Sequence, residues 1–288
     1  MKHRIQIDGG ERDIDIRGMD ASFIVYRKMY VPPLTPANIG SVNPGDPAGL
    51  EGYLKSDGPK IIEEFFRKQI RAIGSCAILA WDQGGVIGKM YFTTKELFAS
   101  VGSAAEALGL HHDEFPGCMC IENSDMPKVV RSFSEDRLQS LLASPSRTLR
   151  ILCLNVGHFD TRYHGKGIAS AMLEFLKAWA PERGWHTLEA PSCADVVPFR
   201  ALGPHILRRS YLEKRGFHAV EEKPAQLEDT ERRRSGIERI LSGNLNEGDW
   251  DVKSYAWNIE MVRRLASDPA WQEVYDKTYI MACDLEAS

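Results

Sequence analysis

The sequence has few cysteines, no long apolar run and no large excess of charge of either sign. Six cysteines in 288 residues are too few for a disulfide framework. Cys76, Cys153 and Cys283 lie inside apolar segments, where buried thiols are expected. The first 18 residues lack the apolar stretch of a signal peptide, and no apolar run approaches the roughly 18 residues of a membrane span. We therefore expect a cytoplasmic protein with no membrane partner.

The charge balance argues against a nucleic-acid partner. The formal net charge is −4 at pH 7, and a mildly acidic chain is poorly suited to binding polyanions over a broad surface. The basic run at 231–239 is mixed with acids, which is typical of a solvated helix face. With 43% hydrophobic and 26% charged residues, the composition is that of a globular protein with a sizeable core.

The hydrophobic pattern alternates between strand and helix periodicity. Apolar segments around Asp82-Gln83-Gly84-Gly85 give a strong hairpin signal over 76–94. The order predicts an α/β or α+β chain around one mixed sheet, and we treat it as a single domain of residues 1–288. The predicted elements are strands at 13–19, 147–156, 185–191, 217–222 and 277–285, helices at 60–74, 168–180 and 203–217, some helix within 95–147, and a helical tail from 223 to about 275.

The segment "HGKGIAS" (164–170) places two glycines where a loop becomes a helix. The first N–H groups of a helix lack internal partners, and glycines let several of them face one anion, so a phosphate is a natural ligand. A tight turn without a ligand is the alternative. A Rossmann loop would need a third glycine where Ser170 stands, and a Walker loop would need Ser or Thr where Gly167 follows Lys166.

Two motifs together resemble a known family. "HGKGIASAMLEFLKAWAPERGW" (164–185) resembles the central Arg/Gln-x-x-Gly-x-Gly/Ala motif of the GNAT superfamily of acetyl-CoA-dependent N-acyltransferases. "YLEKRGF" (211–217) resembles its second signature, and the two occur in the family's order with a strand between them. The resemblance covers 13–27, 60–94, 147–190, 204–222 and the final strand. The resemblance implies insertions at 28–59, 95–146 and 223–276. Insertions commonly form an acceptor pocket or an oligomer contact, so a homodimer is one expectation.

The resemblance implies a largely antiparallel central sheet flanked by helices and a site for acetyl-CoA. Two positions depart from the motif, because His164 stands in the Arg/Gln place and Arg162 begins a second register. The charge on the cofactor phosphates is therefore expected from Arg162, His164 or both. The implied cofactor-binding residues are Cys153, Leu154, Asn155 and Val156 on the central strand, then Arg162, His164, Gly165, Lys166, Gly167, Ile168, Ala169 and Ser170.

The resemblance also implies transfer of an acetyl group to a primary amine by direct attack, which requires a base and an acid. The family's tyrosine acid falls on Leu212, so the adjacent Tyr211 is the candidate acid, with packing as the alternative. Glu189 and His158 are candidate bases, although each is also an ordinary strand-end or loop residue. Weaker candidates are Asp195, His205 and, as a nucleophile, Cys193.

No metal is expected in the reaction. His111, His112, Cys118 and Cys120 lack the spacing of a zinc site, so a loop followed by a strand is the better interpretation. A protein of the same fold that binds acyl-CoA as a sensor or interaction module, without turnover, is the alternative function. The sequence does not identify the amine.

Overall fold

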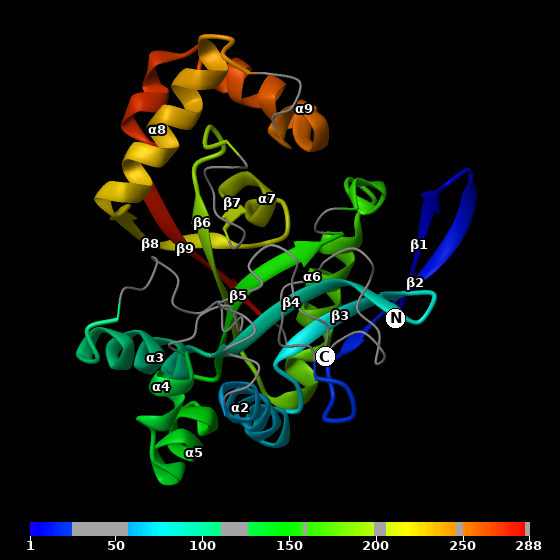
Figure 1. Ribbon diagram of the computed structural model, residues 1–288, viewed down its shortest axis with the longest axis vertical. Helices are drawn as coiled ribbons and strands as arrows, with labels where there is room; N and C mark the ends of the chain where they lie inside the picture. The colour runs from blue at the N-terminus through cyan, green and yellow to red at the C-terminus, as the bar shows by residue number, and fades with distance from the viewer. Residues whose placement is uncertain (25–56, 111–125, 158–159, 199–205, 246–249, 286–288) are drawn as a thin grey trace. The chain divides into compact units, whose positions relative to one another are not determined.

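The computed structural model describes residues 1–24, 57–110, 126–157, 160–198, 206–245 and 250–285 (Figure 1). The chain divides into two compact units, Met1–His186 with Leu285–Ser288, and Thr187–Asp284. The interpretation of residues 1–288 as a single domain stays a prediction. Most of the first predicted insertion, residues 28–56, lies outside the described residues.

The first unit contains five antiparallel strands in sequence order. Two tight turns join the hairpins: Asp8-Gly9 (φ 50° and 76°) and Gln83-Gly84 (φ 47° and 81°). Positive φ at both central positions is the type I′ geometry that suits the strand twist. The hairpin predicted at 76–94 is confirmed. The strands are β1 Lys2–Ile7, β2 Gly10–Gly18, β3 Ala77–Asp82, β4 Gly85–Thr94 and β5 Thr148–Val156.

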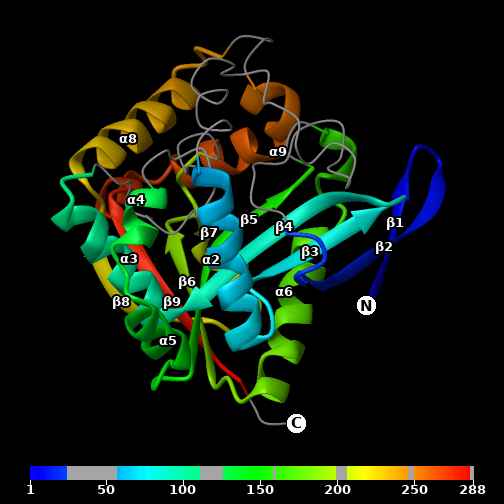
Figure 2. The ribbon, with the colours of Figure 1, turned by 60° about the horizontal axis from the view of Figure 1, so that its bottom comes forward.

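Helices cover both faces of this sheet (Figure 2). On one face, Phe66 of α2 (Gly58–Ile73) contacts Tyr91, with the ring centroids 5.5 Å apart. On the other, Trp179 of α6 (Ile168–Trp179) lies 5.4 Å from Phe92. Successive strand residues point to opposite faces, so Tyr91 and Phe92 assign the two helices to opposite sides of β4. Both helices confirm the sequence prediction.

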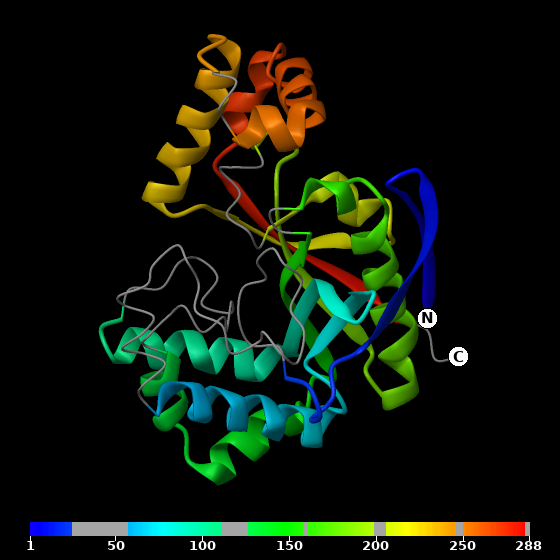
Figure 3. The same cartoon turned by 45° about the vertical axis from the view of Figure 1, so that its right-hand side comes forward.

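Three helices follow β4 (Figure 3). They are α3 Lys95–Ala107, α4 Met126–Arg131 and α5 Glu135–Ala143. Of these, α4 and α5 contact α2, and α3 contacts α4 and α5. Thr94 accepts a hydrogen bond from the Leu97 amide at 3.1 Å, and Ser134 accepts one from the Arg137 amide at 3.2 Å. These are side-chain N-caps, which define where α3 and α5 begin. The predicted helical content of 95–147 is confirmed.

The second unit has its own strands, with β9 paired antiparallel to both β6 and β8, and β7 parallel to β6. The strands are β6 Thr187–Cys193, β7 Leu207–Arg208, β8 His218–Pro224 and β9 Lys277–Asp284. The prediction of an α/β chain with mixed, largely antiparallel strands flanked by helices is therefore confirmed.

Among the described helices, none combines the length and apolar character of a membrane span. Cys76, Cys153, Cys193 and Cys283 are buried thiols.

The helix predicted over 203–217 is wrong in its first part. Leu207 and Arg208 form β7, and α7 spans only Arg209–Glu213. The guanidinium of Arg208 donates to the carbonyl oxygens of Asp195 at 2.9 Å and Val197 at 3.0 Å. These tertiary contacts anchor an extended backbone, which a local apolar period cannot reveal.

The tail of the second unit is helical, as predicted. Its helices are α8 Leu227–Leu241 and α9 Trp250–Leu265, followed by a short 3₁₀ segment at Pro269–Glu273. Arg233 of α8 is 1% exposed. Its Nη1 donates to the Lys277 carbonyl at 3.1 Å, and its Nη2 donates to Thr278 Oγ1 at 3.3 Å. Arg233 thus fastens α8 to the start of β9.

Arg233→Ala tests this attachment. We expect the free energy of unfolding to fall by about 2–4 kcal/mol, because charge-assisted hydrogen bonds and buried contacts are lost together. The control is the neighbouring Arg234→Ala, whose exposed ion pair with Glu238 at 3.5 Å contributes less than about 0.5 kcal/mol. Urea denaturation measures both values, and equal losses would contradict the assignment.

Candidate anion-binding site

The candidate site begins where β5 leaves the sheet of the first unit. Tyr91 pairs with Cys153 and Phe92 with Ile151, so Leu152 is an extra residue and forms a β-bulge. Bulges bend a strand and re-aim the residues beyond it. Of the predicted strand residues, Cys153 is buried, whereas Leu154, Asn155 and Val156 are half-buried. The bulge was not foreseen, because register is not encoded in the sequence of one strand.

Three glycines in the left-handed region shape the loop between β5 and α6. Gly157, Gly165 and Gly167 have φ values of 69°, 70° and 76°. Gly167 is the N-cap of α6, and its carbonyl accepts the first helical hydrogen bond, from Ala171 at 2.9 Å. A Cβ placed on Gly165 would have no atom within 4 Å, so space is open beside this backbone. The loop therefore has the open backbone and helix start that an anion requires.

The other predicted loop residues take different positions around this start. Ile168 is 1% exposed and belongs to the core, while Ala169 and Ser170 are half-buried in the first helical turn. Lys166 is exposed, and its carbonyl oxygen lies 2.9 Å from Nε2 of His3 in β1. The N-terminal hairpin thus contacts the glycine loop, across 163 positions of sequence.

Arg162, one of the two predicted phosphate-binding cations, is already held by two carboxylates. Its Nε and Nη2 donate to Asp160 at 2.9 and 2.6 Å, and its Nη1 donates to Asp8 at 3.0 Å. The hydrogen bond from Arg162 is the main reason that the pKa of Asp160 is lowered, and the same hydrogen bond raises the pKa of Arg162. An anion would have to compete with these carboxylates.

His164, the other predicted cation, is half-buried in the loop. Burial lowers the pKa of its imidazole from the ordinary value, and a backbone hydrogen bond with Val156 opposes that shift. The lowered pKa favours the neutral ring at pH 7. In this geometry His164 supports the loop, and the positive charge available to a phosphate comes from Lys166 and Arg162.

A network of hydrogen bonds and ion pairs anchors the loop, with its buried end at Tyr163 and Asp82. Tyr163 is 4% exposed, and its hydroxyl donates to Asp82 at 2.8 Å. Burial, together with this hydrogen bond, raises the pKa of Tyr163 to about 12. Arg12 Nη1 also donates to Asp82, at 2.9 Å, and its Nη2 donates to Asp8 at 3.3 Å. The ion pairs therefore run continuously from Asp82 through Arg12 and Asp8 to Arg162.

A cavity of about 340 Å³ lies between the first hairpin turn and the loop. Two of its side chains, Arg162 and Lys166, are basic, and one, Asp8, is acidic. Its lining residues are Gln6, Ile7, Asp8, Gly9, Arg162 and Lys166. The two cations in the lining suit a phosphate-bearing ligand, and Asp8 is the one opposing charge among the lining residues.

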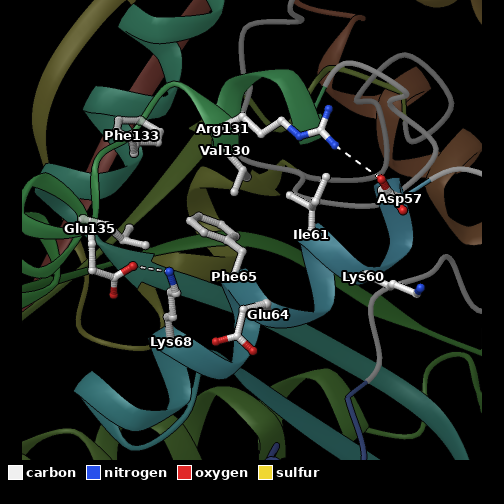
Figure 4. A pocket seen from close by; sticks show the side chains of 11 residues that line it. Asp57, Lys60, Ile61, Glu64, Phe65, Lys68, Val130, Arg131, Phe133 and Glu135 are labelled. Atoms are coloured by element: carbon white, nitrogen blue, oxygen red, sulfur yellow. Dashed lines mark hydrogen bonds and ion pairs between the residues drawn. The ribbon is translucent and has the colours of Figure 1, made fainter.

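A second cavity, of about 420 Å³, lies between α2, α4 and α5 (Figure 4). Its apolar wall includes Phe65, and two ion pairs join α2 to the other helices, Asp57 with Arg131 and Lys68 with Glu135. The lining has three basic and three acidic side chains, so it offers an anion no net positive charge. It is lined by Asp57, Lys60, Ile61, Glu64, Phe65, Lys68, Val130, Arg131, Phe133, Glu135 and Leu138.

The described catalytic candidates lie in the second unit. Tyr211 is half-buried on α7, where Arg215 lies over its ring at 3.6 Å and donates to its carbonyl at 2.7 Å. Glu189 is 5% exposed on β6, opposite Ala282 of β9. Asp195 accepts a hydrogen bond from the Ser210 amide at 3.1 Å, which gives it a structural role at the start of α7.

Several other candidates cannot be placed. His158 and His205 lie outside the described residues, as do His111, His112, Cys118 and Cys120. Cys193 is buried at the end of β6. Within the ranges that the structure covers, no group of three or more His, Cys, Asp or Glu side chains is positioned to hold a metal ion.

Sequence reasoning missed the residues that fix the loop: His3, Asp8, Arg12, Asp82 and Asp160. Asp8 and Arg162 are 154 positions apart, so no local motif connects them. The available signal was the Asp8-Gly9 pair between alternating residues, which indicates a tight hairpin. That pair predicts a first hairpin but not where the hairpin packs.

Comparison with family models and with curated proteins finds no match. Among solved structures, the chain is similar to arylalkylamine N-acetyltransferase 2 from Aedes aegypti (15% identity, 95% of this chain and 99% of that one, TM-score 0.41). It is also similar to a polyamine N-acetyltransferase of Drosophila melanogaster that forms N-acetylagmatine (12%, 95% and 100%, 0.38). A third is the GNAT-like decarboxylase GphF in complex with isobutyryl-CoA (14%, 78% and 85%, 0.35).

Two of these structures are N-acetyltransferases and the third is described as GNAT-like, and GNAT is the superfamily whose motifs the two sequence segments resemble. At identities of 12–15% and TM-scores of 0.35–0.41, the likenesses carry no argument about the substrate or reaction of this chain. The chain's own loop and motifs remain the basis for a functional proposal.

The loop geometry predicts different costs for alanine at two glycines with nearly equal φ. A Cβ on Gly157 would lie 2.6 Å from the Asp160 carbonyl oxygen, whereas one on Gly165 would meet nothing within 4 Å. We expect Gly157→Ala to lower the free energy of unfolding by about 3 kcal/mol or more, and Gly165→Ala by about 1 kcal/mol. Chemical denaturation measures both, and equal effects would contradict this loop conformation.

Proposed function

We propose that this protein is an acyltransferase that moves an acetyl group from acetyl-CoA to a primary amine. The observation that carries the proposal is the glycine loop, with Gly165 and Gly167 in the left-handed region at the start of α6, at the end of the loop that follows β5. This geometry occurs in the segment that resembles the GNAT cofactor motif. The second signature follows in the order that the family requires.

In this proposal the backbone N–H groups of residues 165–170 hold the pyrophosphate of coenzyme A. Helix N-termini favour such anions through their unpaired N–H groups and their dipole. Lys166 supplies positive charge near the loop, while His164 supports the loop in neutral form. The pantetheine arm lies along β5, at Cys153–Val156. The bend that the Leu152 bulge gives this strand supports a ligand approaching its backbone there.

Acetyl-CoA, when bound, supplies an activated thioester. The acceptor amine must lose a proton before it attacks, and the leaving thiolate must gain one. We assign the second role to the Tyr211 hydroxyl and the first to Glu189, or to His158, which the structure does not describe. Donors directed at the developing oxyanion would lower the barrier further.

Binding is tested by a pair of glutamate substitutions at glycines with the same backbone strain. Gly165 and Gly184 have φ values of 70° and 74°, and neither would have an atom within 4 Å of a Cβ. Gly165→Glu adds negative charge at the proposed phosphate position, so we expect it to abolish the rise in melting temperature caused by acetyl-CoA. Gly184 lies beyond the C-terminal end of α6, so we expect Gly184→Glu to retain the rise in melting temperature caused by acetyl-CoA.

A failure of acetyl-CoA to shift the melting temperature of the wild-type protein would contradict the proposed cofactor. Equal shifts in the wild type and in both variants would contradict the loop as its site. Because each variant has its own melting temperature without ligand, the comparison separates binding from damage to the fold.

Turnover is tested by free-thiol release with a panel of primary amines. We expect Tyr211→Phe to lower kcat by about 100-fold or more, the range for a lost general acid, with little change in KM for acetyl-CoA. The control is Tyr275→Phe, which removes a hydroxyl from a ring packed 5.4 Å from Trp271. Unchanged kcat in Tyr211→Phe would make Tyr211 a packing residue.

The second candidate function is an acyl-CoA sensor without turnover. The contact between Arg215 and Tyr211 favours it, because a ring covered at 3.6 Å by the guanidinium of Arg215, just beyond the end of α7, has an evident packing role. Binding of acetyl-CoA without thiol release for any amine would select this function.

A further inference from the structure

The turn of the first hairpin is tied to the glycine loop by one exposed ion pair. Asp8 Oδ2 accepts a hydrogen bond from Arg162 Nη1 at 3.0 Å. The side chains are 44% and 54% exposed, so water and ions reach the contact. Exposed ion pairs of this kind are weak and exchange readily for other partners.

The two carboxylates on Arg162 are not equivalent. Asp160 takes two hydrogen bonds from the guanidinium, comes from the same loop and is 12% exposed. Asp8 takes one and comes from the hairpin turn. Arg12 Nη2 also reaches Asp8, at 3.3 Å, so this carboxylate keeps a cation if Arg162 turns away. The bond to Asp8 is therefore the one that Arg162 can exchange.

The same ion pair lies in the wall of the 340 Å³ cavity. Asp8 contributes negative charge where Arg162 and Lys166 would otherwise attract an anion. A phosphate that enters the cavity is repelled by Asp8. After a local rearrangement it can instead bind the Nη1 group of Arg162, which now donates to Asp8.

We propose that Asp8 is a built-in competitor for the phosphate-bearing ligand, which on binding takes Arg162 Nη1 from Asp8 and so breaks the ion pair between the hairpin turn and the loop. The identity of that ligand as coenzyme A rests on the proposed function. Asp8 then sets the affinity of the site, and no covalent bond changes. The inference assigns a functional role to the N-terminal hairpin, which the sequence motifs do not include.

Asp8→Asn tests the inference with little effect on the backbone. Asp8 has φ 50° in a type I′ turn, where asparagine is a favoured residue. We expect coenzyme A to bind the variant roughly two- to fivefold more tightly, the range set by one exposed ion pair. Isothermal titration calorimetry of the full chain with coenzyme A measures the change.

The matched control is Asp13→Asn, in the same hairpin. It removes the same charge but breaks an ion pair with Arg4 at 3.3 Å instead of one with the loop. A similar gain in both variants would show only a general charge effect and would overturn the inference. Unchanged or weaker binding in Asp8→Asn would overturn it as well.

A second arm places the effect on Arg162. In an Arg162→Gln background, we expect Asp8→Asn to bring no gain beyond that of Asp13→Asn, because Asp8 then has no guanidinium of Arg162 to compete for. A full gain in that background would overturn the inference.

Inorganic pyrophosphate, used as a separate probe, distinguishes this inference from the proposed function. Tighter pyrophosphate binding by Asp8→Asn, without coenzyme A binding to any form, would support the competitor role and contradict the proposed cofactor. Binding of neither probe to the wild type would overturn both.

Discussion

The reversal of the chain between β5 and α6 is the constraint on which the site depends. The apolar face of α6 must pack against the sheet of the first unit, and Met172, Leu176 and Trp179 are buried there. To bring this face onto the sheet, the chain turns back within the residues between Val156 and Ile168. Left-handed glycines at 157 and 167 make that turn feasible, because other residues adopt this backbone only with strain. The packing thereby fixes the position of the N-terminus of α6.

The electrostatics of the loop combine rigid and exchangeable parts. Asp82, buried beneath the loop, accepts hydrogen bonds from Tyr163 and Arg12, and burial together with the first of these bonds raises the pKa of Tyr163. The exposed end of the network, where Arg162 meets Asp8, is accessible to solvent. An anion arriving at the loop thus meets a fixed backbone and a cation that can change partners. In the proposed site, preorganised backbone donors would raise the affinity for a phosphate, and Asp8 would lower it as an internal competitor.

The sequence predicted the elements whose signals are local. The amphipathic period of α6, the hairpin turn at Gln83-Gly84 and the apolar run of β9 each lie within one segment, and all are confirmed. Elements determined by distant contacts were missed or wrong. The strand β7 is held by the carbonyls of Asp195 and Val197, which accept hydrogen bonds from Arg208. The strand β1 was missed although the Asp8-Gly9 turn beside it is a local hairpin signal.

In the site, too, local sequence patterns were predictable and contacts between distant residues were not. The glycine loop could be found from its spacing, but the partners of its charges could not. The sequence predicts His164 as a phosphate-binding cation, but its burial lowers the pKa of its imidazole. The sequence likewise predicts Arg162 as a free cation, but in the structure it donates hydrogen bonds to Asp160 and Asp8. The catalytic assignments of Tyr211, Glu189 and His158 remain predictions, since they depend on where an acceptor binds.

The central claim is that the backbone N–H groups after β5 bind the phosphates of coenzyme A. Its most direct test is a titration of ¹⁵N-labelled protein with acetyl-CoA, followed through the amide resonances of the whole chain. We expect the largest saturable shifts at the amides of residues 165–170. Saturable binding whose largest shifts lie elsewhere, with those amides unchanged, would contradict it.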